Sequence, residues 1–239
     1  MKKTWLRIFV VLGVLYLVSI VASVIIIVGP KGHIPSKTIL EADFEKQLVE
    51  NVPESPTAKV LLSDRAVMRD VVDALDRGAD DKRVVGLVAR IGASRMGVAQ
   101  AQELRDAVLR FRAKKKFTIA FSETFGEFGP GNTAYYLATA FEQVYLQPSG
   151  DIGLTGIMLE SPFIKGTLAK LGTRFHGDHR YEYKTALNLF TESKFTPAHR
   201  EEDQAIIDSW FSQMKEGICK GRQIPPDEFA VEGYIVKEA

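Results

Sequence analysis

A lysine among aromatic residues is the first candidate for chemistry in this sequence. Lys184 lies in the segment Tyr181-Glu182-Tyr183-Lys184-Thr185-Ala186, between a predicted strand and a predicted long helix. A lysine can take a proton from a serine hydroxyl when burial lowers its pKa toward neutrality, and the reaction then needs amide donors for the oxyanion. By spacing alone, a solvated surface lysine is the favoured interpretation, and catalysis is the alternative.

A glycine-rich loop is the second candidate. The segment Gly126-Glu127-Phe128-Gly129-Pro130-Gly131-Asn132-Thr133 precedes a predicted helix and could offer backbone N–H groups to a phosphate or an oxyanion. It lacks the Lys-Ser/Thr ending of a P-loop and does not match a dinucleotide-binding fingerprint. A turn that requires glycine is therefore the favoured interpretation.

Metal and thiol chemistry have weaker candidates. His176 and His179 flank Asp178, but in an extended stretch their rings point to opposite faces, which disfavours a metal site. Ser122 follows a predicted strand near the glycine-rich loop and is interpreted as a polar residue at the strand end. The single Cys219 excludes an intrachain disulfide and a site built from several cysteines. We expect no metal and no cofactor.

The elements that must position these residues alternate between strands and helices. Continuous apolar runs predict buried strands at residues 84–89 and 117–121, and a third strand is predicted at 144–146. Helical spacing of apolar residues predicts helices around residues 67–75, 101–111 and 134–138. Alternation of this kind is typical of βαβ units, so the sequence predicts an α/β fold with a largely parallel sheet.

A long helix is predicted to follow the lysine. Thr196 is a good N-cap and Pro197 suits the first helical position, while the acidic residues 201–203 lie near the positive end of the helix dipole. Before the lysine, we expect a short helix ended by Gly172 and a strand at 173–175. The buried face of the long helix is predicted to consist of Ile206, Ile207, Trp210, Phe211, Met214 and Ile218.

The N-terminal segment predicts a transmembrane helix. From Ile8 to Val28 about 21 residues carry no charge, which matches the hydrocarbon thickness of a bilayer. Lys2, Lys3 and Arg7 precede the run and place the N-terminus in the cytoplasm by the positive-inside rule. A cleaved signal peptide with small residues at 21–23 and a buried core helix are the competing interpretations.

Composition restricts the class of protein. The chain has 239 residues, of which 46% are hydrophobic and 26% charged, so it can bury a core and is not disordered. The 31 basic and 30 acidic residues give a net charge of +1, which offers no case for nucleic-acid binding. We expect three parts: a cytoplasmic tip and anchor at 1–28, a tether with an edge strand near residues 38–40 at 29–59, and an α/β domain at 60–239.

Taken together, several motifs resemble the signal peptide peptidase A family, also called protease IV, in its long form with two copies of the fold. In order along the chain, the motifs are Ala134-Tyr135-Tyr136-Leu137-Ala138, Val144-Tyr145-Leu146-Gln147-Pro148, Gly153-Leu154-Thr155-Gly156, Tyr183-Lys184-Thr185-Ala186, Thr196-Pro197-Ala198 and Gly221-Arg222-Gln223-Ile224-Pro225. The resemblance implies a fold of the Clp protease and crotonase type. It also implies a serine peptidase with a Ser/Lys dyad, in which Lys184 is the general base.

The sequence departs from the family pattern at four places. Asn132-Thr133-Ala134 stands where serine-bearing copies have Ser-Gly-Gly, so this chain resembles the N-terminal copy, which supplies only the lysine. Tyr181 replaces a frequent glycine and Leu189 a frequent proline. The turn at 91–94 lacks most of the glycines that form an oxyanion hole in the serine-bearing copy. Residues 233–239 resemble the start of a longer family segment, so we expect the chain to be a fragment that is inactive alone.

The resulting expectation is a membrane-anchored serine peptidase that degrades cleaved signal peptides and short apolar peptides. Its expected partners are the peptide substrate, the membrane and further copies of itself, with four subunits implied by the resemblance and no nucleic acid. The expected location is the bacterial inner membrane, with the domain outside the cytoplasm. A non-catalytic peptide-binding or assembly scaffold is the alternative, and an acyl-CoA enzyme of the same fold rests on analogy only.

Overall fold

The computed structural model describes residues 12–20, 34–52, 65–92, 96–127, 129–229 and 234–238. The chain divides into two compact units, residues 1–38 and 39–239, and each is treated by itself. The predicted parts 1–28, 29–59 and 60–239 stay a prediction, because residues 1–11, 21–33 and 53–64 lie outside the described residues.

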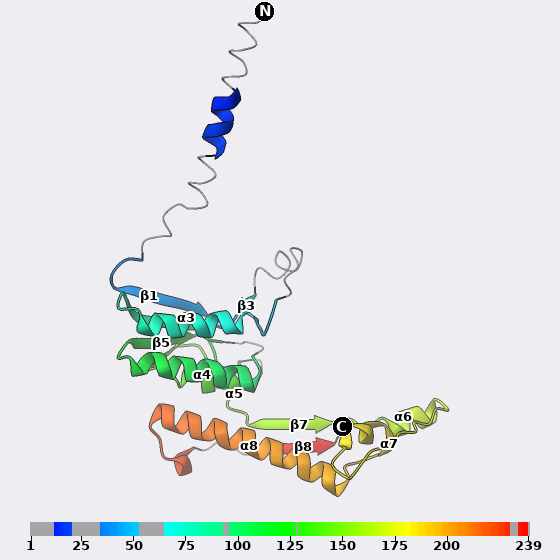
Figure 1. Cartoon of the computed structure of the whole chain (residues 1–239). Helices are drawn as coiled ribbons and strands as arrows, with labels where there is room; N and C mark the ends of the chain where they lie inside the picture. Colours follow the sequence, from blue (N-terminus) through cyan, green and yellow to red (C-terminus); the bar gives the residue numbers. More distant parts are fainter. Residues whose placement is uncertain are drawn as a thin grey trace, which may run out of the picture. The chain divides into compact units, whose positions relative to one another are not determined.

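In the first unit, residues 12–20 form a helix, drawn in blue in Figure 1. Its apolar side chains are exposed, with Leu15 and Tyr16 at 59% and 70% of full exposure. The other residues of the predicted span at 8–28 lie outside the described residues. Within the described part of the chain, no helix combines the length and the apolar character that crossing a bilayer requires.

The second unit contains a sheet with the strand order β1-β4-β5-β6. Its strands are β1 (Thr38–Asp43), β4 (Val84–Arg90), β5 (Phe117–Ser122) and β6 (Gln143–Leu146). The pairs β4–β5 and β5–β6 are parallel, with Leu87 opposite Thr118 and Ala120 opposite Val144. The three predicted strands and the α/β class are confirmed, although β6 has only exposed and half-buried residues. The edge strand predicted near residues 38–40 is β1.

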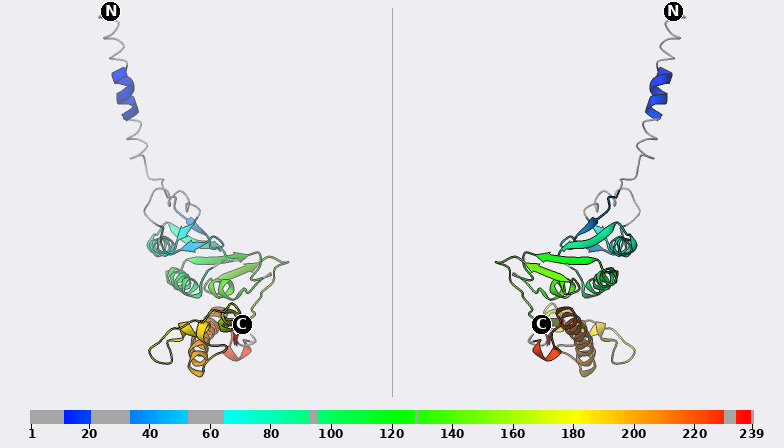
Figure 2. Two further views of the ribbon diagram at one scale, coloured as in Figure 1. Left: turned by 90° about the vertical axis from the view of Figure 1, so that its right-hand side faces the viewer. Right: turned by 90° about the vertical axis from the view of Figure 1, so that its left-hand side faces the viewer.

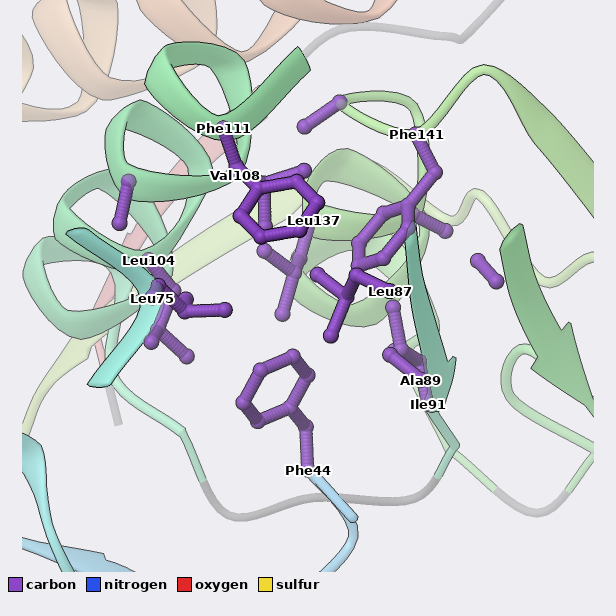
Figure 3. Packing of buried hydrophobic residues seen from close by; sticks show 14 of the residues in the cluster. Phe44, Leu75, Leu87, Ala89, Ile91, Leu104, Val108, Phe111, Leu137 and Phe141 are labelled. Atoms are coloured by element: carbon purple, nitrogen blue, oxygen red, sulfur yellow. The ribbon is translucent and has the colours of Figure 1, made fainter. Parts of the chain in front are cut away.

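Three helices lie along one face of this sheet (Figure 2). They are α3 (Met68–Asp80), α4 (Val98–Ala113) and α5 (Asn132–Ala138), and they correspond to the three predicted helices. The first begins at Met68, after Val67, which the sequence predicts to be helical, because Ala66 and Val67 form β3, which pairs in parallel with β2 (Leu48–Val49). Figure 3 shows Leu104 and Phe111 of α4 packed among Phe44, Leu87 and Phe141.

The two faces of the sheet differ. Thr118, Ala120 and Ser122 of β5 are fully buried under the helices, while Phe117 and Phe121 on the opposite face are 37% and 38% exposed. Tyr145, which pairs with Phe121, is 54% exposed on the same face. Parallel strands normally have both faces covered, so this face is unusual in lacking a cover among the described residues.

The C-terminal elements form a second group around a long helix (Figure 1). They are β7 (Ile157–Ser161), α6 (Lys165–Lys170), η1 (Thr185–Leu187), α7 (Asn188–Thr191), α8 (Pro197–Arg222), η2 (Pro226–Glu228) and β8 (Tyr234–Glu238). The strands β7 and β8 pair in parallel. The predicted strand at 173–175 is wrong, since these residues are irregular; the strand forms earlier, as β7.

The start of α8 agrees with the prediction. Thr196 is the N-cap, and its hydroxyl accepts a hydrogen bond from the backbone N–H of His199 at 3.2 Å. The predicted buried face is partly wrong, because Ile206 and Trp210 are 39% and 41% exposed. Ile207, Met214 and Ile218 are buried as predicted, and Asp203 is buried with them.

A buried arginine joins α8 to the helices of the sheet. Arg105 of α4 is only 5% exposed. Its guanidinium donates to the backbone oxygens of Tyr136 and Gly217, both at 2.6 Å, and to the hydroxyl of Thr139 at 2.8 Å. It also lies 4.7 Å from the centre of the Tyr136 ring. Burial lowers the pKa of Arg105 from its usual value, and hydrogen bonds to carbonyl oxygens replace part of the lost hydration.

Two glycines permit the close approach of α8 that these bonds require. A Cβ atom at Gly217 would overlap the ring of Tyr136, and one at Gly221 would overlap the backbone oxygen of Thr139. The two positions are one helical turn apart, so they share a face of α8. The sequence of α8 therefore fixes both the distance and the register of its contact with α5.

Replacing Arg105 tests the importance of the buried guanidinium. We expect Arg105→Met to lower the free energy of unfolding by about 2–4 kcal/mol, because it removes the three hydrogen bonds to Tyr136, Thr139 and Gly217. Arg110→Met on the same helix is the matched control, since Arg110 and Asp76 form a half-exposed pair worth about 1 kcal/mol or less. Urea denaturation followed by circular dichroism measures both, and equal losses would contradict the assignment.

Substitution of the contact glycine gives a second test. Gly221→Ala should destabilise the protein by about 1–3 kcal/mol, because the added methyl meets a backbone carbonyl that has little freedom to move. Gly166→Ala in α6 is the control: nothing lies within 4 Å of its Cβ position, and alanine favours the helix by about 0.5–1 kcal/mol. Thermal unfolding should shift in opposite directions for the two variants.

Candidate functional site

The segment around Lys184 begins with a left-handed turn. Tyr181 has φ of 65°, a conformation that glycine adopts without cost and a bulky residue adopts only with strain. Its backbone oxygen accepts a hydrogen bond from the N–H of Lys184 at 3.4 Å, and η1 starts at the next residue. Tyr181, which replaces a glycine that is frequent in the family, therefore occupies a position where the backbone favours glycine.

The two neighbours of Lys184 are both hydrogen-bonded to α8. The Tyr183 hydroxyl donates to Oε2 of Glu201 at 2.9 Å. The Thr185 hydroxyl donates to Oε2 of Glu202 at 2.8 Å. Residues 181–187, the lysine segment, are thus held on the first turns of α8 by one bond on each side of Lys184.

Lys184 itself is exposed and lines an open cavity of about 530 Å³. The walls are formed by residues 178–180 and 183–187 and by Glu202 of α8. A neutral lysine that accepts protons requires an environment that excludes water. The described residues leave this side chain open to solvent, so catalysis as a base would require a further surface to cover the cavity.

Asn132 has a different setting. It is buried at 8% exposure in the first turn of α5, and its amide donates to the backbone oxygen of Gly156 at 2.6 Å. The neighbouring Gly131 N–H donates to Gly153 at 2.9 Å, while Gly126 has φ of 102°. These bonds tie the glycine-rich loop to the 153–156 segment, and an amide is no nucleophile. The turn interpretation of this loop agrees with the structure.

The remaining candidates have structural partners. Ser122 is fully buried, and its hydroxyl donates to the backbone oxygen of Thr124 at 2.8 Å, as expected of a polar residue at a strand end. His179 Nδ1 lies 2.8 Å from the oxygen of Tyr181. Among the described residues, no group of three or more His, Cys, Asp or Glu could hold a metal ion. Cys219 is a free, buried thiol.

Sequence reasoning missed a buried polar cluster beside the N-terminus of α8. His199 and Asp203 are 5% and 9% exposed, with His199 Nε2 3.6 Å from the carboxylate of Asp203. The Ser161 hydroxyl donates to the same carboxylate at 3.2 Å, which connects β7 to α8. The His199 ring packs edge-on against Phe195 and Phe163, and its Nδ1 has no hydrogen-bond partner among the residues that the structure describes. The signal was the i, i+4 spacing of His199 and Asp203.

With this geometry established, comparison with known proteins identifies the class. The sequence pattern of peptidase family S49 matches residues 111–231, which include α5, β7, the lysine segment and α8. The chain therefore belongs to peptidase family S49, the family of signal peptide peptidase A that the motifs predicted.

Individual relatives agree with this assignment. The chain is 26% identical over 163 residues to Protease 4 of Salmonella typhi, a match that covers 66% of this chain and 25% of that protein. It is 23% identical over 159 residues to Protease 4 of Haemophilus influenzae, with the same coverage of 66% and 25%. The chloroplastic serine protease SPPA of Arabidopsis thaliana is 22% identical over 142 residues, covering 59% of this chain and 20% of that protein. The chain thus matches about a quarter or less of these relatives.

The hydrogen bond between Tyr183 and Glu201 predicts a titration. It raises the pKa of Tyr183 above the usual 10.0, because an ionised phenol would lose the bond and face the carboxylate charge. The sign follows: the stabilisation is present below pH 10 and is lost as the pH rises through the raised pKa. Glu201→Gln should move the pKa of Tyr183 back down.

Absorbance at 295 nm, taken as the difference between the protein and its Tyr183→Phe variant, isolates this one tyrosine. Glu182→Gln is the control, because Glu182 contributes less than Glu201 to the same shift. A Tyr183 titration unchanged by Glu201→Gln would show that the carboxylate charge of Glu201 does not act on the phenol in solution.

Proposed function

We propose that this chain supplies the lysine general base of a serine peptidase. The supporting observation is Lys184, whose segment matches the family motif, lies inside the region matched by family S49 and opens onto a cavity. In the proposed step, the neutral Lys184 amine accepts the proton of a serine hydroxyl while the serine oxygen attacks a peptide carbonyl. Protonated Lys184 then donates that proton to the leaving amine.

The nucleophile comes from a second copy of the fold carrying Ser-Gly-Gly, as the resemblance implies. Two features of this chain support the proposal. Asn132, at the matching position, offers an amide bonded to Gly156. Lys184 is exposed, so a surface that brings the serine would also exclude water from the amine. The uncovered sheet face with Phe117, Phe121 and Tyr145 favours assembly with further copies, for which we propose four subunits.

The substrates proposed are cleaved signal peptides and other short apolar peptides at the bacterial inner membrane. The uncharged run at 8–28, preceded by Lys2, Lys3 and Arg7, supports an N-terminal anchor with the domain outside the cytoplasm. The exposed apolar side chains of the helix at 12–20 are consistent with that anchor. A membrane location would place the site where apolar peptides are released.

A non-catalytic scaffold is the second candidate. Two observations favour it: an asparagine stands at the serine position, and Lys184 is open to solvent. A protein of this kind would bind peptides or assemble with active relatives without cleaving anything.

Hydrolysis of a fluorogenic apolar peptide by the purified natural gene product separates these functions. Lys184→Ala should reduce kcat by about 10² to 10⁴, because removal of a general base has that effect. Lys184→Arg should be equally inactive, since arginine stays protonated, whereas Lys170→Ala in α6 should retain activity. Full activity of Lys184→Ala would refute the base assignment, and a natural protein without hydrolysis would favour the scaffold.

A further inference from the structure

The residues on either side of Lys184 make the same kind of contact with α8. The residue before the lysine and the residue after it each donate a side-chain hydroxyl, and the two acceptors are the consecutive carboxylates of Glu201 and Glu202. The donor and acceptor are 18 residues apart in the first bond and 17 in the second, so neither arises from local chain geometry.

Consecutive residues of a helix point in directions about 100° apart. Glu201 and Glu202 therefore approach the lysine segment from two directions. Two bonds of different direction restrict both the sliding and the rotation of a segment, which a single bond does not. The left-handed turn at Tyr181 limits the segment on its N-terminal side, and η1 limits it on the C-terminal side.

We propose that Glu201 and Glu202 are positioning residues that fix the backbone of Lys184 for proton transfer, an inference that rests on the proposed role of Lys184 as the base. A lysine side chain has four rotatable bonds, so its amine reaches a defined place only when the Cα atom is held. The carboxylates hold it through Tyr183 and Thr185 and do not touch the reacting atoms.

Hydrogen exchange measured by mass spectrometry on the whole chain tests the positioning without any need for activity. Glu202→Ala should speed exchange in residues 181–187 about tenfold, as expected for loss of one hydrogen bond to a charged group. Thr185→Val should give the same increase, and the double variant no more than either alone. Glu202→Gln should restore slow exchange, because its amide oxygen can still accept from Thr185.

Glu182→Ala is the matched control, since it removes an exposed carboxylate from the same segment without removing an acceptor of the two bonds. Exchange in residues 210–220 of α8 should be unchanged in every variant. Additive effects of Thr185→Val and Glu202→Ala, or no increase at residues 181–187, would overturn the inference.

Peptide hydrolysis then separates this inference from the proposed function. Glu202→Ala should lower kcat about tenfold to a hundredfold with little change in KM, and Glu202→Gln should recover most of the loss. A kcat that does not fall although exchange is faster overturns the positioning role while leaving the base intact if Lys184→Ala is inactive. Activity retained in Lys184→Ala refutes the proposed function itself, even when the exchange pattern is as expected.

Discussion

The contact between α8 and the helices of the sheet depends on a buried cation, Arg105, whose hydrogen-bond acceptors within the described part of the chain are uncharged. Arg105 is nearly inaccessible, and a charge in that position is unfavourable unless its donors are satisfied. Three of its hydrogen bonds go to the backbone oxygens of Tyr136 in α5 and Gly217 in α8 and to the hydroxyl of Thr139, the residue that follows α5. Two of these acceptors are backbone groups of α5 and α8, so the relative placement of the two helices is part of what makes the burial of Arg105 possible. The group formed by β7, β8 and α8 is joined to the sheet through this contact.

The long helix α8 consequently has two halves with different contacts. Its C-terminal half is packed closely against α5, with Gly217 and Gly221 at the contact. Its N-terminal half carries Glu201 and Glu202, which hold the lysine segment, and His199 and Asp203, which face β7 and the aromatic rings. One rigid element thus links the core of the fold to the proposed base.

The features predicted correctly from the sequence are those decided by neighbouring residues. Continuous apolar runs mark β4 and β5 because buried parallel strands need apolar side chains on both faces. Thr196 and Pro197 mark the start of α8 because capping is local. Lys184 is recognisable from its motif, whereas the hydrogen bonds that its neighbours Tyr183 and Thr185 make to α8 are not, since these join residues 18 and 17 positions apart.

The errors have equally specific causes. Ile206 and Trp210 were assigned to the buried face on hydrophobicity, yet they lie roughly 100° and 60° around the helix axis from Ile207, away from the stripe that packs. Residues 173–175 have strand-like composition but no neighbouring strand, and the segment that finds a partner is β7, which pairs with β8. Propensity cannot identify a pairing partner that is distant in sequence.

Gly217, at the contact with α5, lies far along α8 from Glu201 and Glu202, so a small tilt of the helix at the glycine end produces a large displacement at the glutamates. Gly217 and Glu202 are 15 residues apart, about 22 Å along a helix. A tilt of about 5° at the glycine end would carry the carboxylate of Glu202 through about 2 Å, more than a hydrogen bond tolerates. The packing of α8 against α5 therefore determines how accurately Glu202 is placed relative to the segment that carries Lys184. A substitution at that distant contact can change the geometry of the cavity although it does not line the cavity.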